Sequence, residues 1–183
     1  MRDVHEQALE YATRDDFEQI FYNDMSSLHM LALMLTGDQA TAEKCFVAGL
    51  QESIEGNPVF RQWARSWSKR VIIKNAIRMM SPVPGEVNPE PLAAAESTAF
   101  ERDDLLSVVW ELPTFERFVF VISVLEGHSV SDCASLMGCT LTELTRARSQ
   151  ALRQIALARG VGAAAPQSGQ AEPVLFIVKP ELA

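Results

Sequence analysis

The chain has 183 residues and a formal net charge of −8, with 48% hydrophobic and 22% charged residues. That composition supports a packed core and argues against wholesale disorder. The acidic balance argues against a protein that coats nucleic acid non-specifically, because lysine and arginine carry that kind of binding.

The cysteines Cys45, Cys133 and Cys139 lie inside or beside helical patterns and form no Cys-x-x-Cys pair. No signal-peptide pattern opens the sequence, and no apolar run approaches the length of a membrane span. We therefore expect reduced thiols and a soluble, cytoplasmic protein without a membrane partner.

Apolar periodicity predicts helices in the first part of the chain. Residues 4–12 are expected to form a short leading helix. Asp15 or Asp16 then caps a stronger helix, in which apolar residues recur at three- and four-residue spacing from Phe17 to Leu35.

Turn and cap residues mark the next helix boundaries. Gly37 ends the stronger helix, and Asp38 caps another. Asn57 is a good cap and Pro58 a good first helical residue, so a long third helix is expected to begin there and to stop before Pro82. Helices joined by such short loops make a small bundle.

The third helix is basic and carries no acidic residue between positions 61 and 78. Its cations are Arg61, Arg65, Lys69, Arg70, Lys74 and Arg78. After Lys69 the apolar residues move to the other side of the helix, so the helix bends there or its end packs on a different partner. Two interpretations stay open: a solvated basic face over an aromatic core, or a nucleic-acid surface in which cations follow phosphates and an aromatic ring stacks on an unpaired base. Trp63 and Trp67 are predicted to be core residues rather than stacking platforms.

Residues 81–101 hold four prolines, four glutamates and no lysine or arginine, which predicts an acidic, partly extended linker. Half of the net charge lies in this segment. Beyond it, Asp103 or Asp104 caps a helix that Pro113 ends, and Thr114 opens the next one.

Two short helices near the C-terminus have the outline of a helix-turn-helix. Ser129 caps a helix that ends at Gly138, and Thr140 caps the next, with Glu143 three residues later completing a capping box. Gly138 supplies the positive φ that a tight turn between helices often needs. A helix-turn-helix places its second helix in a DNA major groove, so DNA binding is the first hypothesis.

The sequence thus predicts an all-α protein of two small helical domains joined by a flexible linker. The domains are expected over residues 1–80 and 102–158, the linker over 81–101 and a mobile tail over 159–183. The tail contains an apolar VLFIV run to which the sequence assigns no role.

Two blocks of residues carry a family resemblance. In the C-terminal block they are Leu112-Pro113, Arg117, Glu126-Gly127-His128-Ser129, Ala134, Leu136, Gly138 and Ala151. In the N-terminal block they are Leu35-Thr36-Gly37-Asp38, Ala42-Glu43, Phe60 and Trp63. Over about residues 15–80 and 102–158 the chain resembles the short, extracytoplasmic-function sigma factors of bacterial RNA polymerase, whose two helical domains are termed regions two and four.

The resemblance implies a DNA-binding transcription initiation factor that binds core RNA polymerase and promoter DNA. It also implies an anti-sigma-like protein as an inhibitory partner. In region two the implied DNA-contacting residues are Arg61, Arg65, Lys69, Arg70, Lys74 and Arg78. Along the recognition helix of region four they are Thr142, Thr145, Arg146, Ser149, Gln150 and Arg153.

The chain departs from the family pattern where the polymerase docks. Lys44, Val47 and Ala48 stand where family members usually carry polar docking residues, so the docking site is degenerate. This departure keeps a second hypothesis open, in which a sigma-like scaffold serves as a protein-interaction or regulatory module that has lost its polymerase and DNA contacts.

Catalysis is not expected. His5, His29 and His128 are scattered without a partner at metal-ligand spacing, and no glycine-rich phosphate loop follows a predicted strand. We therefore expect no enzyme activity, no metal site and no cofactor.

Overall fold

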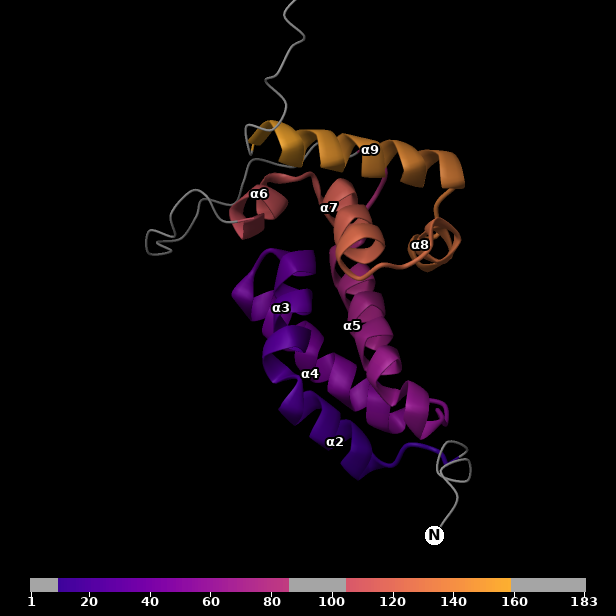
Figure 1. Ribbon diagram of the computed structural model, residues 1–183. Helices are drawn as coiled ribbons and strands as arrows, with labels where there is room; N and C mark the ends of the chain where they lie inside the picture. Colours follow the sequence, from indigo (N-terminus) through magenta and orange to yellow (C-terminus); the bar gives the residue numbers. More distant parts are fainter. Residues whose placement is uncertain (1–9, 86–104, 159–183) are drawn as a thin grey trace, which may run out of the picture.

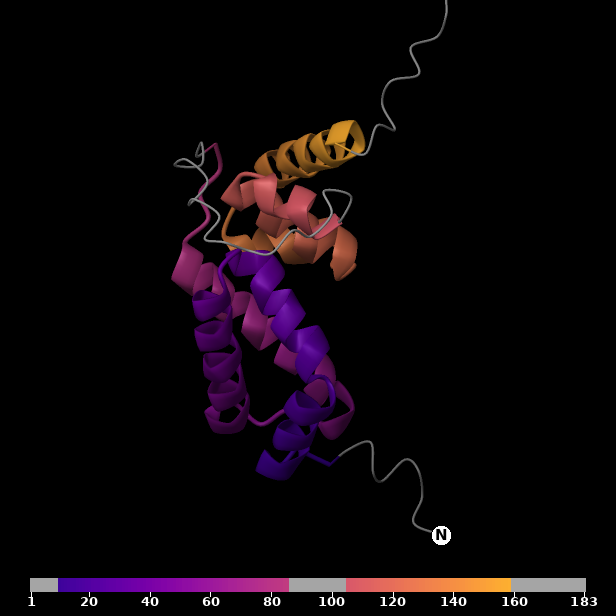
Figure 2. The same ribbon diagram turned by 90° about the vertical axis from the view of Figure 1, so that its left-hand side faces the viewer.

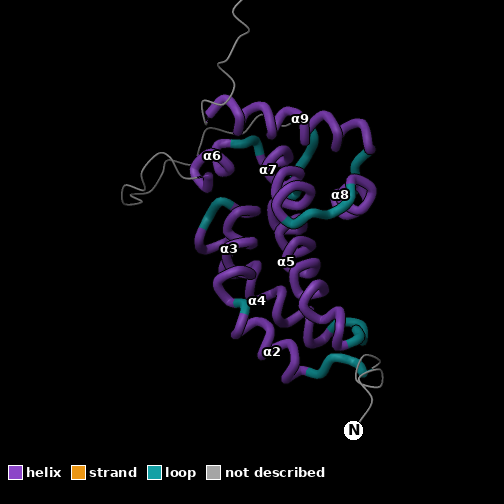
Figure 3. Tube along the Cα trace, viewed as in Figure 1, coloured by secondary structure: helices purple, strands orange, loops and turns teal. Residues whose placement is uncertain are grey.

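The computed structural model describes residues 10–85 and 105–158, and within these ranges the protein is all-α (Figure 3). The described helices are α2 (Arg14–Asn23), α3 (Met25–Thr36), α4 (Gln39–Glu55), the 3-10 turn η1 (Arg61–Trp63), α5 (Ala64–Met80), α6 (Leu105–Glu111), α7 (Thr114–Phe120), the π-helical turn η2 (Val121–Leu125), α8 (Val130–Met137) and α9 (Leu141–Ala158). The predicted fold class is confirmed. We refer below to residues 10–85 as the N-terminal segment and to residues 105–158 as the C-terminal segment.

The helices of the C-terminal segment stack on one end of the N-terminal bundle (Figures 1 and 2). In that bundle α3, α4 and α5 pack on one another, and α2 closes the bundle against α5. Within the C-terminal segment, α9 lies across α7, with α6 and α8 on either side.

One hydrophobic cluster runs through both segments. It includes Leu31, Leu35 and Ile73 of the N-terminal segment together with Phe115 and Ile122 of the C-terminal one. The two segments therefore share apolar surface, while their division into the domains 1–80 and 102–158 stays a prediction.

The predicted caps and turns are confirmed at several helix ends. Gly37 ends α3 with φ 74°, and the backbone N–H of Thr41 donates to the Asp38 carboxylate at 2.7 Å. Gly138 ends α8 with φ 64°, and the N–H of Thr140 donates to the Glu143 carboxylate at 2.8 Å. Such contacts satisfy backbone groups that have no partner within the helix.

The single helix predicted from Asp15 or Asp16 to Leu35 is wrong in two details. Asp24 (φ −102°, ψ 15°) separates α2 from α3. The N-cap of α2 is Thr13, whose hydroxyl accepts from the N–H of Asp16, and the Asp16 carboxylate accepts from the N–H of Thr13 in return. Asp16 is thus the third residue of a capping box rather than the cap.

The third helix does not begin at Asn57 and Pro58. The backbone at Phe60 is extended, with the N–H of Ala12 donating to the carbonyl of Val59 at 2.7 Å and the rings of Tyr11 and Phe60 stacked at 4.8 Å. Helical structure starts at η1 and α5 only after this contact. A tertiary contact therefore outweighs the local helix-start signal.

Several sequence predictions fall outside the described residues. These are the first part of the leading helix (4–9), most of the linker, the cap at Asp103 or Asp104, and the tail with its VLFIV run. Residues 10–12, which the leading helix was expected to include, are not helical. In the described part of the chain, no helix combines the length and apolarity that crossing a membrane requires.

Candidate nucleic-acid interface

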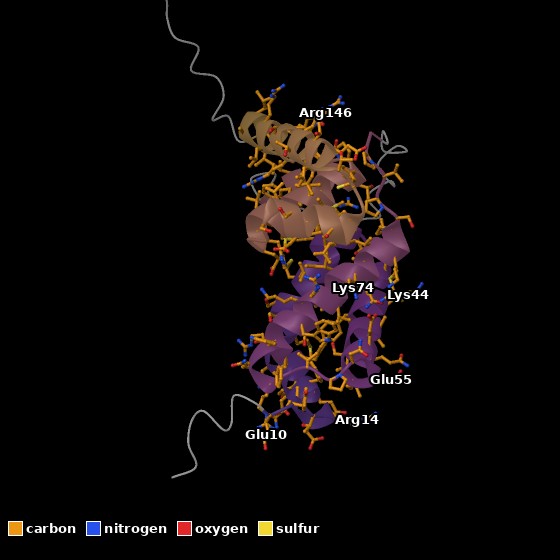
Figure 4. All side chains as sticks on the ribbon, turned by 90° about the vertical axis from the view of Figure 1, so that its right-hand side faces the viewer. Glu10, Arg14, Lys44, Glu55, Lys74 and Arg146 are labelled. Carbon is orange, nitrogen blue, oxygen red and sulfur yellow. The ribbon has the colours of Figure 1, made fainter. Side chains whose placement is uncertain are left out.

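Helix α9 packs one face on the protein and exposes the opposite face. Leu144, Ala147, Ala151 and Ile155 are buried, and α9 packs against α7 and α8. The residues predicted to contact DNA lie on the other side, where all but the half-buried Gln150 are exposed: Thr142, Thr145, Arg146, Ser149, Gln150 and Arg153. Figure 4 shows Arg146 pointing outward from α9, at the opposite end of the molecule from Glu10 and Arg14.

Arg146 and Arg153 provide the positive charge of this exposed face. They lie seven residues apart on one side of the helix, which corresponds to a rise of about 10 Å. Neither forms an ion pair with a described residue. On the same face, the hydroxyls of Thr145 and Ser149 donate to the carbonyls four residues earlier, at 2.7 and 3.0 Å, so their oxygens stay available as acceptors.

The cations of η1 and α5 are placed differently, because most of them already have partners. Arg61 pairs with Glu10 and Asp16, and Arg65 pairs with Asp24 at 3.0 Å. The remaining contacts are Lys69 with Glu126 at 2.8 Å, Arg78 with Glu52, and Lys74 over the ring of Trp67 at 5.8 Å. Arg70 is half-buried and forms no ion pair with a described residue.

The pairing lowers the positive potential that α5 presents to a nucleic acid. Exposed pairs of this kind are worth about 0–1 kcal/mol each, so a phosphate can displace the carboxylate at little cost. The Asp16 carboxyl illustrates the balance. Burial would raise its pKa, but the hydrogen bonds from Thr13 and the guanidinium of Arg61 together lower it below its ordinary value.

The prediction that Trp63 belongs to the core is wrong. Trp63 is 55% exposed, and its ring meets the ring of Phe60 edge-on at 5.4 Å. Trp67 is half-buried, and its indole N–H is buried without a hydrogen-bond partner among the described residues. Three consecutive buried residues, Val71–Ile73, show that the second half of α5 is enclosed on more than one side, which accounts for the change in phase after Lys69.

The residues of the degenerate docking site lie on α4. Lys44 and Val47 are exposed, Val47 to 62%, and Ala48 is half-buried. Lys44 points away from the bundle (Figure 4). The surface on which the resemblance places a polar docking run is therefore partly apolar here, and polymerase binding through it stays a prediction.

The position of Arg117 was not foreseen from the sequence. Its side chain is 6% exposed and reaches from α7 to the end of α3, where Nε donates to the carbonyl of Leu35 at 3.2 Å and Nη2 to that of Thr36 at 3.4 Å. Burial lowers the pKa of Arg117 below its ordinary value. The partners are 81 and 82 residues away, and no local pattern signals such a contact.

The described residues contain no group of three His, Cys, Asp or Glu side chains that could hold a metal ion. Burial raises the pKa of the Cys45 and Cys133 thiols to about 11, which makes them poor nucleophiles near neutral pH.

The sequence matches no family model and no curated protein. Among solved structures, the chain is similar to the sigma factor RpoE in its co-crystal structure with the anti-sigma factor NepR from Bartonella quintana. The identity is 18%, the TM-score is 0.47, and the match covers 80% of this chain and 98% of that chain.

Proposed function

We propose that this chain is a DNA-binding transcription initiation factor of the sigma type, which binds core RNA polymerase and places α9 in the major groove of promoter DNA. The observation that carries the proposal is the geometry of α8, Gly138 and α9. A left-handed glycine ends α8, a capping box starts α9, and the face of α9 turned away from the protein is polar and exposed. The helix-turn-helix of DNA-binding proteins presents its second helix in this way.

The exposed face of α9 has the side chains that groove binding requires. Arg146 and Arg153 suit phosphates or guanine edges, and the hydroxyls of Thr142 and Ser149 suit base edges. The residues of both sequence blocks that resemble sigma factors support the choice of this class among the many users of a helix-turn-helix.

A salt titration tests the DNA contact. Each phosphate contact contributes about −0.9 to the slope of log affinity against log salt. We therefore expect Arg146→Gln/Arg153→Gln to weaken DNA binding and to make the slope shallower by about 2. Arg14→Gln is the matched control for each single variant, Arg146→Gln or Arg153→Gln, since it also removes one charge and Arg14 is exposed at the opposite end of the molecule (Figure 4). Equal binding by the single variants and the control would contradict the role of α9.

A pull-down with core RNA polymerase tests the second part of the proposal. The native chain is compared with Val47→Gln/Ala48→Glu, which restores the polar residues that the family carries. Binding of the native chain to the polymerase supports the initiation factor. Failure of both the native chain and the variant to bind argues against it.

One observation favours a second candidate, a sigma-like protein-interaction module. Arg61, Arg65, Lys69 and Arg78 are all ion-paired within the protein, although the resemblance assigns them to DNA. Recovery of polymerase by the Val47→Gln/Ala48→Glu variant alone, together with DNA affinity that does not fall as salt rises, would support this candidate.

A further inference from the structure

A buried arginine joins the two segments of the chain. Arg117, on α7 of the C-terminal segment, donates through Nε and Nη2 to the carbonyls of Leu35 and Thr36 at the end of α3 in the N-terminal segment. These carbonyls belong to the last turn of a helix, where acceptors lack partners within the helix and the helix dipole is negative. The end of α3 is therefore a suitable receptor for a cation.

Gly37 leaves the space that the guanidinium occupies. A Cβ atom at this position would lie 3.1 Å from Nη1 of Arg117 and 3.4 Å from its Cζ. Gly37 also has φ 74°, which a residue with a side chain rarely adopts. The same glycine thus ends α3 and makes room for the arginine.

Carbonyl oxygens alone receive this charge. No carboxylate of a described residue forms an ion pair with Arg117. A buried charge loses its hydration, and carbonyls repay only part of that loss, so the contact fixes the position of the two segments more than it adds stability. When the segments separate, the guanidinium returns to water, and its regained hydration offsets part of the cost of exposing the apolar surface that the segments share.

A second polar contact joins the segments in the N-terminal half of α5. Nζ of Lys69 lies 2.8 Å from a carboxylate oxygen of Glu126, and the side chains are 36% and 14% exposed. Glu126 directly follows η2, and η2 packs on α3, so the position of Glu126 depends on that packing. Lys69 is one of the cations that the resemblance to sigma factors assigns to DNA.

We propose that Arg117 and the Lys69–Glu126 pair form a reversible latch that closes the C-terminal segment on the N-terminal one. In the closed arrangement Lys69 is withdrawn from nucleic acid. This second point rests on the proposed function. Closing and DNA binding at α5 then compete, and by linkage each disfavours the other.

Energy transfer between two dyes tests the latch without DNA. The labels are placed by Asn23→Cys and Gln154→Cys, both exposed positions, in a Cys139→Ser background that keeps the buried Cys45 and Cys133. We expect Lys69→Glu to lower the transfer efficiency and Lys69→Glu/Glu126→Lys to restore it. The matched control is Arg78→Glu, which breaks a pair with Glu52 inside the N-terminal segment and should leave the efficiency unchanged.

Arg117→Met is the second variant, since it removes the charge and keeps an unbranched side chain. We expect lower transfer efficiency with unchanged helix content by circular dichroism. If Arg117→Met does not fold, the Lys69 and Glu126 variants decide alone. Unchanged transfer efficiency in the folded Lys69→Glu protein overturns the latch.

Binding of a labelled mixed-sequence DNA duplex tests the competition. Glu126→Gln frees Lys69 and alters no residue assigned to DNA, so we expect affinity to rise about fivefold, the value of one partly exposed ion pair. Unchanged affinity in a variant that the dyes show to be open overturns the competition. Absence of DNA binding by every protein contradicts the proposed function, and the dye measurement then still decides whether the latch exists.

Discussion

Replacement of Gly37 by alanine separates two costs that the structure places at one residue. The first is the left-handed backbone, with φ 74°, which costs an alanine about 1–2 kcal/mol. The second is the approach of the new Cβ to the guanidinium of Arg117, 3.1 Å from Nη1. At that distance the arginine must move, and its hydrogen bonds to the end of α3 weaken.

Gly127 supplies the matched control for the backbone cost. Its φ is 70°, and a Cβ there would have no heavy atom within 4 Å. Hydrogen bonds of a charged group are worth about 1.5–3 kcal/mol, and both bonds of Arg117 are long, at 3.2 and 3.4 Å. We therefore expect Gly37→Ala to lower the free energy of unfolding by about 1–3 kcal/mol more than Gly127→Ala does.

Urea unfolding followed by circular dichroism measures both variants, and a double-mutant cycle assigns the difference. In an Arg117→Met background the excess cost of Gly37→Ala should disappear, because the group that it displaces is gone. Equal costs of Gly37→Ala and Gly127→Ala in the native background would refute this account of Gly37.

Three further substitutions test local features of the fold. Hydrogen bonds from the backbone and hydroxyl of Thr140 lower the pKa of Glu143, so the carboxylate stabilises the protein above its ordinary pKa, and this stabilisation is lost as pH falls through its pKa in the folded protein. Glutamine does not titrate, so the stability of Glu143→Gln should fall less steeply than that of the native protein as pH drops below about 4. Urea unfolding at several pH values measures this, and parallel profiles would contradict it. Gly49→Ala should destabilise by about 1–3 kcal/mol although alanine favours helices, because its Cβ would lie 2.8 Å from Cγ1 of Ile72, and an Ile72→Ala background should remove that cost. Ser81→Gly should raise the melting temperature, because Ser81 ends α5 with φ 45°, a conformation that costs a side-chain-bearing residue about 1 kcal/mol, and a lower melting temperature would argue against strain there.

Sequence reasoning succeeds where a few neighbouring residues decide the structure. The capping box of Thr140 and Glu143 and the left-handed glycines at 37 and 138 act over three or four residues, so their roles follow from spacing alone.

The same reasoning fails where a distant part of the chain decides. Asn57 and Pro58 carry a helix-start signal, yet no helix begins there, because the residues that follow, up to Phe60, pair with residues 10–12. The carboxylate that meets Lys69 lies 57 residues away, so the sequence presented α5 as a free basic surface. The burial of Arg117 could not be predicted for the same reason, since the carbonyls that accept its hydrogen bonds belong to the other segment.

The ion pairs along α5 also affect how the protein meets a charged partner. A cation beside a carboxylate behaves at a distance as a dipole, whose field falls off faster than that of a single charge. The molecule as a whole carries −8, and DNA is negative, so long-range forces do not steer the two together. The arginines of α9 act only at contact, within about 10 Å at moderate salt. Association with DNA should therefore be slow for the free protein, and a partner that already holds the DNA would supply the encounter that electrostatics does not.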